Sequence, residues 1–172
     1  STRGLKPGSK VEFEGHMLEV ELGPGLLSKN FDGLQNDLDK MEGVFLKRGQ
    51  YTPALEDDKK WSFAPLAKAG DKVIAGDWLG NVKENWLDHK IMVPFKFEGE
   101  YTVESVAKEG EYTINDVIAT LKDKEGEIHN VTMVQKWPVK LAVKAYKNKP
   151  RPFRLLETGI RVIDTMNPIL EG

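Results

Sequence analysis

Two copies of one pattern decide the fold of this chain: Ala67-Lys-Ala-Gly-Asp-Lys-Val-Ile-Ala-Gly-Asp-Trp-Leu-Gly-Asn-Val82 and, one residue shorter, Ala107-Lys-Glu-Gly-Glu-Tyr-Thr-Ile-Asn-Asp-Val-Ile-Ala-Thr-Leu121. In each copy, Gly-Asp, Gly-Glu or Asn-Asp pairs separate runs of β-branched or large apolar residues, which predicts strand, turn and strand. Another β-rich run, residues 90–103, lies between the copies. The chain is therefore expected to be mainly β, with two similar hairpins forming a small, quasi-symmetric β-sandwich or flattened barrel.

The repeated pattern resembles the barrel-sandwich fold of biotinyl and lipoyl carrier domains. In those carriers, a lysine on an exposed hairpin between the two copies is acylated. Lys90 lies 20 residues after Gly70 and 20 residues before Gly110. One hypothesis is therefore a swinging-arm carrier with biotin or lipoate on Lys90, and the other is an ordinary surface lysine. The flanking residues His89 and Ile91 differ from the Met or Asp of the carriers, which favours the surface lysine.

Composition limits the classes of function. The 172 residues are 40% hydrophobic, enough for a globular core, and carry a net charge of −2 with a pI near 6.0. This balance gives no reason to expect nucleic acid or direct membrane insertion, and no apolar run is long enough for a membrane span. Cysteine is absent, which excludes disulfides and thiolate chemistry. We expect a cytoplasmic protein.

The N-terminal part predicts further elements. Residues 5–15 contain a Pro-Gly turn followed by an alternating strand, and residues 17–22 predict another alternating strand, so this part looks like the end of a β-barrel. A Gly-Pro-Gly turn follows at residues 23–25. Helix spacing, ended by Gly43, then predicts one amphipathic helix or, because Gly33 interrupts it, two short ones. The apolar residues at that spacing are Leu27, Phe31, Leu34, Leu38 and Met41.

Six strings carry a second resemblance, and they occur in one order along essentially the whole chain. They are residues 20–35, 49–55, 60–65, 89–94, 109–117 and 133–139. Together they resemble the catalytic A subunit of V-type and archaeal-type rotary ATPases. One departure is that Asn36-Asp37 stands where that family has Arg-Pro. Losing the proline is expected to let the predicted helix continue.

The family resemblance implies the organisation of the chain. Its parts are residues 1–22 as the end of an N-terminal β-barrel; 23–64 as the Gly-Pro-Gly turn, helix and connecting strands; 65–137 as a barrel-sandwich insertion called the bulge; 138–154 as a basic, proline-containing linker; and 155–172 as the start of a nucleotide-binding domain. In the last part we expect a short helix with Thr158 as N-cap and Pro168 as its stop. The basic run from Lys140 to Arg154 could also be a nucleic-acid strip, but proline and the acidic chain favour a linker.

The sequence shows no catalytic machinery of its own. It has no Gly-x-x-x-x-Gly-Lys-Ser/Thr string, so we expect no catalytic residue and no cofactor-binding residue, and the ATP site is expected beyond Gly172. His16, His89 and His129 are far apart, which predicts no metal site. The charged run 56–60 indicates a solvated loop. The four tryptophans, Trp61, Trp78, Trp86 and Trp137, indicate packing in the core or at its rim.

The resemblance also implies a function for a parent protein. That parent would use Mg-ATP and couple its hydrolysis or synthesis to H⁺ or Na⁺ transport. It would alternate with the B subunit in a hexamer and would be cytoplasmic and peripheral to a membrane complex. The segment itself is expected to be structural, with the bulge contacting peripheral stalk or stator proteins. A carrier modified on Lys90 is the alternative, and an interaction module unrelated to ATP is a third class.

Overall fold

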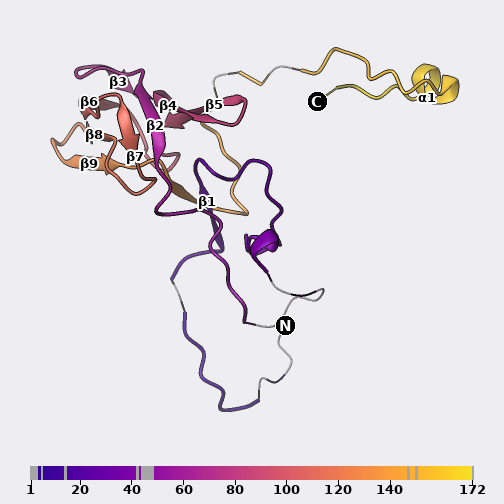
Figure 1. Cartoon of the computed structure of the whole chain (residues 1–172), viewed down its shortest axis with the longest axis horizontal. Helices are drawn as coiled ribbons and strands as arrows, with labels where there is room; N and C mark the ends of the chain where they lie inside the picture. The colour runs from indigo at the N-terminus through magenta and orange to yellow at the C-terminus, as the bar shows by residue number, and fades with distance from the viewer. Residues whose placement is uncertain are drawn as a thin grey trace.

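Eight short strands between residues 61 and 131 form two four-stranded antiparallel sheets (Figure 1). Counted together with the strands that flank it, the first repeat supplies β2 (Trp61–Pro65), β3 (Lys72–Val73), β4 (Trp78–Glu84) and β5 (Leu87–Met92). The second supplies β6 (Tyr101–Val106), β7 (Gly110–Tyr112), β8 (Ala119–Lys122) and β9 (Ile128–Val131). This computed structural model describes residues 4, 6–13, 15–41, 43, 49–146, 148–149 and 151–171.

Each sheet contains three strands from one repeat and one strand from the other repeat. Their orders are β5-β4-β2-β7 and β9-β8-β6-β3, so each repeat contributes three strands to one sheet and its short second strand to the other. Strand β3 pairs with β6, and β7 pairs with β2 in the same way. The quasi-symmetric barrel-sandwich predicted from the repeat is therefore confirmed.

The turn residues of the two copies make equivalent hydrogen bonds. The Asp77 carboxylate accepts one from the backbone N–H of Ile74 (2.9 Å), and Asp116 accepts one from that of Thr113 (2.7 Å). At the same place in the first copy, Gly76 has φ +84°, a left-handed conformation that glycine adopts without steric cost. Aspartate at the end of each turn thus fixes where the next strand begins.

The core lies between the two sheets and consists of equivalent residues from the two copies. Its fully buried side chains include Phe63, Leu79, Val82, Val103, Ile118 and Leu121. The Phe63 ring packs directly against Gly80, because a Cβ added to Gly80 would overlap the ring. Gly80 therefore permits the close approach of β2 and β4.

A separate two-stranded sheet joins the N-terminal part to the end of the sandwich. Strand β1 (Glu19–Leu22) pairs antiparallel with β10 (Gln135–Pro138). The Gln35 side chain extends this edge, accepting a hydrogen bond from Glu21 N and donating one to Glu21 O, both 2.7 Å. The second predicted N-terminal strand is thus only partly right, and residues 9–13 form no strand where the first was predicted. Residues 5 and 14 lie outside the described residues.

The helix predicted from residue 27 to residue 41 is wrong. The segment forms turns, an isolated bridge between Phe31 and Asp37, and one 3₁₀ turn, η1 (Leu38–Lys40). The Asp32 carboxylate accepts hydrogen bonds from Leu34 N (2.9 Å) and Asn36 N (2.8 Å). These local bonds compete with the helical ladder, and Gln35 at φ +63° breaks it.

The C-terminal segment extends away from the sandwich (Figure 1). It contains one short helix, α1 (Arg161–Met166), which ends before Pro168 as expected. Its N-cap is Ile160, not Thr158 as predicted. The Thr158 hydroxyl instead donates to Asp164 (2.6 Å) and accepts from Ile160 N (3.2 Å). Of the expected linker, Lys147 and Pro150 lie outside the described residues.

Candidate functional site

Lys90, the residue that the carrier hypothesis requires on an exposed hairpin, lies inside strand β5. It pairs with Asn81 of β4, and its side chain is half-buried. Its ammonium lies 5.4 Å from the centroid of the Trp78 ring, within cation–π range. The turn of this hairpin is formed by Asn85 and Trp86. The position therefore differs from that of a swinging arm.

Glu84, at the end of β4, is a buried acidic side chain. Its carboxylate is 3% exposed, and its Oε1 accepts hydrogen bonds from the backbone N–H groups of Gly25 (2.7 Å) and Leu27 (3.2 Å). Its Oε2 lies 2.7 Å from His89 Nδ1, which donates to it. Glu84 thus fastens the Gly-Pro-Gly loop to the sandwich. This role was not predicted from the sequence, although Gly80, Val82 and Glu84 alternate on the inward face of β4.

The Gly-Pro-Gly loop lies close to the sandwich because its residues are small. Pro24 is fully buried. A Cβ added to Gly25, which has φ +108°, would contact the Trp61 ring at 3.4 Å, and one added to Gly23 would lie 3.2 Å from Met133 O. The sequence predicts this turn but not its partner, which is the core of the sandwich.

Charged side chains from residues that follow the same loop form a second cluster with Glu56. Lys29 pairs with the buried Asp37 (3.4 Å) and with Glu56 (3.2 Å), and Lys40 approaches both carboxylates. Burial alone would lower the pKa of Lys29, but the hydrogen bonds and charges of Glu56 and Asp37 raise it above 10.5. The Lys29 hydrogen bond and charge in turn lower the pKa of Glu56 below 4.5. Residues 56–60 are exposed around a turn at residues 57–58, as predicted for a solvated loop, and Glu56 in addition takes part in this ion-pair cluster.

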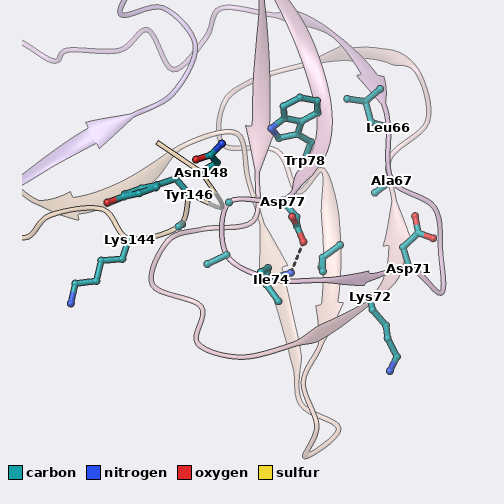
Figure 2. A pocket seen from close by; sticks show the side chains of 14 residues that line it. Leu66, Ala67, Asp71, Lys72, Ile74, Asp77, Trp78, Lys144, Tyr146 and Asn148 are labelled. Carbon is teal, nitrogen blue, oxygen red and sulfur yellow. Dashed lines mark hydrogen bonds between the residues drawn. The ribbon is translucent and has the colours of Figure 1, made fainter. Parts of the chain in front are cut away.

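A pocket of about 810 Å³ lies beside the turn between β3 and β4 (Figure 2). Residues 144–146 cross over that turn, and a Cβ on Gly76 would lie only 2.7 Å from Ala145 O. The Trp137 indole N–H donates to Leu141 O (2.8 Å) and holds the start of this crossing segment. Part of the expected linker is thus packed against the sandwich. The hydrogen bond drawn in Figure 2 joins Asp77 to the backbone of Ile74 and serves the turn.

In the described part of the chain, one group of side chains has the residue types and the spacing that could hold a metal ion. Ligand atoms of Asp123 and Glu127, in the turn between β8 and β9, and of His129, on β9, lie within 4.8 Å of each other. The His129 hydrogen bond (3.0 Å) lowers the pKa of Asp123, whose other oxygen accepts from Glu125 N and Glu127 N. These bonds explain the group as turn structure. The absence of a metal site remains a prediction.

The tryptophans divide between core and surface. Trp61 is 6% exposed, and Trp137 is half-buried with its ring edge-on to Phe95. Trp78 and Trp86 are 57% and 79% exposed, so the expectation of packing is wrong for Trp86 at the turn of the β4–β5 hairpin. In the described residues, no helix has the length and apolar character needed to cross a bilayer.

Comparison with protein families matches residues 52–140 to the ATPsynthase alpha/beta subunit barrel-sandwich domain. The chain therefore belongs to the ATP synthase alpha/beta family that carries this domain. Its relatives include the V-type ATP synthase alpha chain of Borrelia recurrentis, 47% identical over 174 residues, and the A subunit of the A-type ATP synthase of Methanopyrus kandleri, 49% identical over 175 residues. Each alignment covers 99% of this chain, and the resemblance to V-type and archaeal-type A subunits is confirmed.

The chain spans about 30% of the length of these relatives: 30% of the Borrelia protein and 29% of the Methanopyrus protein. The alpha chain of Protochlamydia amoebophila is similar, with 46% identity over 174 residues. The matched family domain begins at residue 52 and so includes β2 together with the loop that precedes it.

Proposed function

We propose that this chain supplies the barrel-sandwich segment of the catalytic A subunit of a V/A-type rotary ATPase. The observation that carries the proposal is the 45–49% identity, over 99% of the chain, to alpha chains of V-type ATP synthases and to the A subunit of an A-type ATP synthase. The complete enzyme would use Mg-ATP and couple its turnover to H⁺ or Na⁺ transport. Residues beyond Gly172 would bind the nucleotide.

Within that enzyme the segment has a structural role. Residues 1–22 belong to an N-terminal barrel, 23–64 connect it, 65–137 are the bulge, 138–154 are the linker and 155–172 open the nucleotide-binding domain. Support comes from the absence of a phosphate-binding loop in the sequence and from the geometry of the described polar groups, which serve turns and loop attachment. The catalytic residues lie elsewhere in the enzyme.

The bulge is a contact domain for other proteins of the complex. The B subunit would alternate with the catalytic A subunit in the hexamer, and a peripheral stalk or stator protein would contact the bulge on the cytoplasmic side of the membrane. Trp86, 79% exposed at the turn of a hairpin, supports a protein contact there, since exposed tryptophan is typical of binding surfaces. No nucleic acid is involved.

The test is removal of the sandwich from the complete catalytic chain. Residues 61–134 are replaced by a short Gly-Ser bridge, because β2 begins at Trp61 and β10 at Gln135. Hydrolysis by the soluble A/B head is expected to persist, while ion transport by the reconstituted complex falls. A head that assembles but loses hydrolysis would contradict the structural role.

A point substitution tests the contact surface with less disturbance. Trp86→Ser is expected to weaken transport coupling and stalk binding without changing hydrolysis. Ile128→Ser, 64% exposed on β9 in the other sheet, is the matched control and is expected to change neither. Equal effects of both substitutions would contradict a contact centred on Trp86.

A further inference from the structure

A pocket of about 450 Å³ lies where the Gly-Pro-Gly loop meets the start of β2 and the end of β4. Four lysines line it, Lys29, Lys59, Lys60 and Lys83, and they come from three separate parts of the chain. Among the described residues, only two carboxylates line it with them, those of Glu84 and Glu111. The lining is therefore rich in ammonium groups although the whole chain has a net charge of −2.

The charges of this pocket are only partly neutralised within the described residues. The ammonium of Lys29 pairs with Asp37 and Glu56, while both oxygens of Glu84 already accept hydrogen bonds from the loop and from His89. The ammonium of Lys59 lies 4.3 Å from the centroid of the Trp61 ring. Across the described chain, Lys60 and Lys83 have no carboxylate within ion-pair distance. The ammonium groups of Lys59, Lys60 and Lys83 are thus available to a ligand, and the Glu111 carboxylate in the same lining offsets part of their charge.

Trp61 forms part of the pocket wall. Its side chain lines the pocket and is 6% exposed, yet its indole N–H is buried with no hydrogen-bond acceptor in the described part of the chain. Buried donors almost always have an acceptor, because a buried N–H group without a hydrogen bond costs free energy. Because this nitrogen has no accessible surface, a ligand in the open pocket would contact the ring of Trp61 and the lysines, and not the indole N–H.

We propose that this pocket binds a multiply charged phosphate-type oxyanion. Such a ligand brings several acceptor oxygens and more than one negative charge, which matches the ammonium groups of Lys59, Lys60 and Lys83. A single carboxylate would neutralise only one ammonium. The shared chemistry is a phosphoryl group, and its source is either an inorganic phosphate or the phosphate tail of a nucleotide. This site does not depend on the proposed function.

Titration of the ¹⁵N-labelled 172-residue chain at low ionic strength tests the proposal. Pyrophosphate is expected to shift the indole N–H resonance of Trp61, identified by sequential assignment and by its loss in Trp61→Phe, more than those of Trp78, Trp86 and Trp137. Added salt is expected to weaken the binding. Parallel titrations with orthophosphate and with ATP separate the sources, because a nucleotide site binds ATP more tightly than pyrophosphate. A Trp61 resonance that pyrophosphate and ATP both leave in place would overturn the proposal.

Lysine variants test the location. Lys60→Ala and Lys83→Ala are each expected to weaken pyrophosphate binding about fivefold, as loss of one exposed ion pair does, and Lys60→Arg to retain it. Lys124→Ala, an exposed lysine in the turn between β8 and β9, is the control and is expected to have no effect. If Lys124→Ala weakens binding as much as Lys60→Ala, or if an acidic peptide binds more tightly than pyrophosphate, the assigned site and ligand class are wrong.

Discussion

The Glu84 carboxylate accepts a hydrogen bond from the backbone N–H of Gly25 at 2.7 Å, across 59 residues of sequence. The same carboxylate holds Leu27 N and His89 Nδ1, and it is 3% exposed. A buried carboxylate with three donors is satisfied, and each donor depends on it. This side chain therefore connects two parts of the fold that the sequence shows only as separate motifs.

Glu84→Ala is expected to destabilise the chain by about 2–5 kcal/mol, because it leaves two partly buried N–H groups without their acceptor. Glu84→Gln keeps one acceptor oxygen and is expected to cost less. Urea unfolding at neutral pH measures both. Glu104→Ala on β6, an exposed position, is the control and is expected to stay within about 0.5 kcal/mol of the wild type. A cost for Glu84→Ala as small as that of the control would contradict the attachment role.

Gly80→Ala is expected to destabilise the sandwich by about 1–3 kcal/mol or more through overpacking. The new Cβ would overlap the Phe63 ring and lie 2.8 Å from Ala64 O, so β2 and β4 must move apart. Gly33→Ala is the matched control, since nothing lies within 4 Å of its added Cβ and its φ is not positive. Thermal unfolding distinguishes them. Equal melting temperatures would show that the sheets tolerate the added methyl group.

The sandwich could be predicted from the sequence because its signals are local. The Gly-Asp and Asn-Asp turns recur at one spacing, and the structure uses Asp77 and Asp116 in the same hydrogen bond. The local sequence pattern did not predict the structure that follows residue 27, where a helix was expected. Its apolar residues have the spacing of a helix, but the Asp32 carboxylate accepts hydrogen bonds from the backbone of Leu34 and Asn36, and the Gln35 side chain accepts one from Glu21 of β1. Tertiary and side-chain hydrogen bonds outweighed periodicity.

The groups at the candidate sites were harder to predict than the fold. The inward position of Glu84 follows from alternation along β4, but its partners Gly25 and Leu27 are distant in sequence. The pairing of Glu56 with Lys29 likewise joins residues 27 positions apart. Lys60 and Lys83 gather at one pocket only after β2 and β4 pair. These contacts join residues that are distant in the sequence, so short motifs could not predict them.

Acid is expected to weaken the Lys29–Glu56 contact. The Lys29 hydrogen bond and charge hold the pKa of Glu56 below its ordinary 4.5, so its stabilisation is present above that value and is lost as the pH falls through the folded pKa. The difference in unfolding free energy between wild type and Glu56→Gln should therefore be largest near neutrality and shrink below about pH 4.5. Urea unfolding from about pH 6 to about pH 3 measures it. Glu104→Gln is the control, and a difference for Glu56→Gln that grows on acidification would contradict the sign.

Lys90 is expected to be unmodified in the cell and to contribute modestly to stability. Its ammonium lies 5.4 Å from the Trp78 ring centroid, so Lys90→Ala should cost about 0.5–1 kcal/mol, whereas Lys90→Arg keeps the contact. In the background of Trp78→Leu the cost of Lys90→Ala should fall, which a double-mutant cycle by urea unfolding measures. Intact mass of the natively expressed chain should equal the sequence mass, since a strand position half-covered by a neighbouring ring does not present the amine as a hairpin turn would. A biotinyl or lipoyl increment located on Lys90 would reverse this conclusion and make the carrier hypothesis the better one.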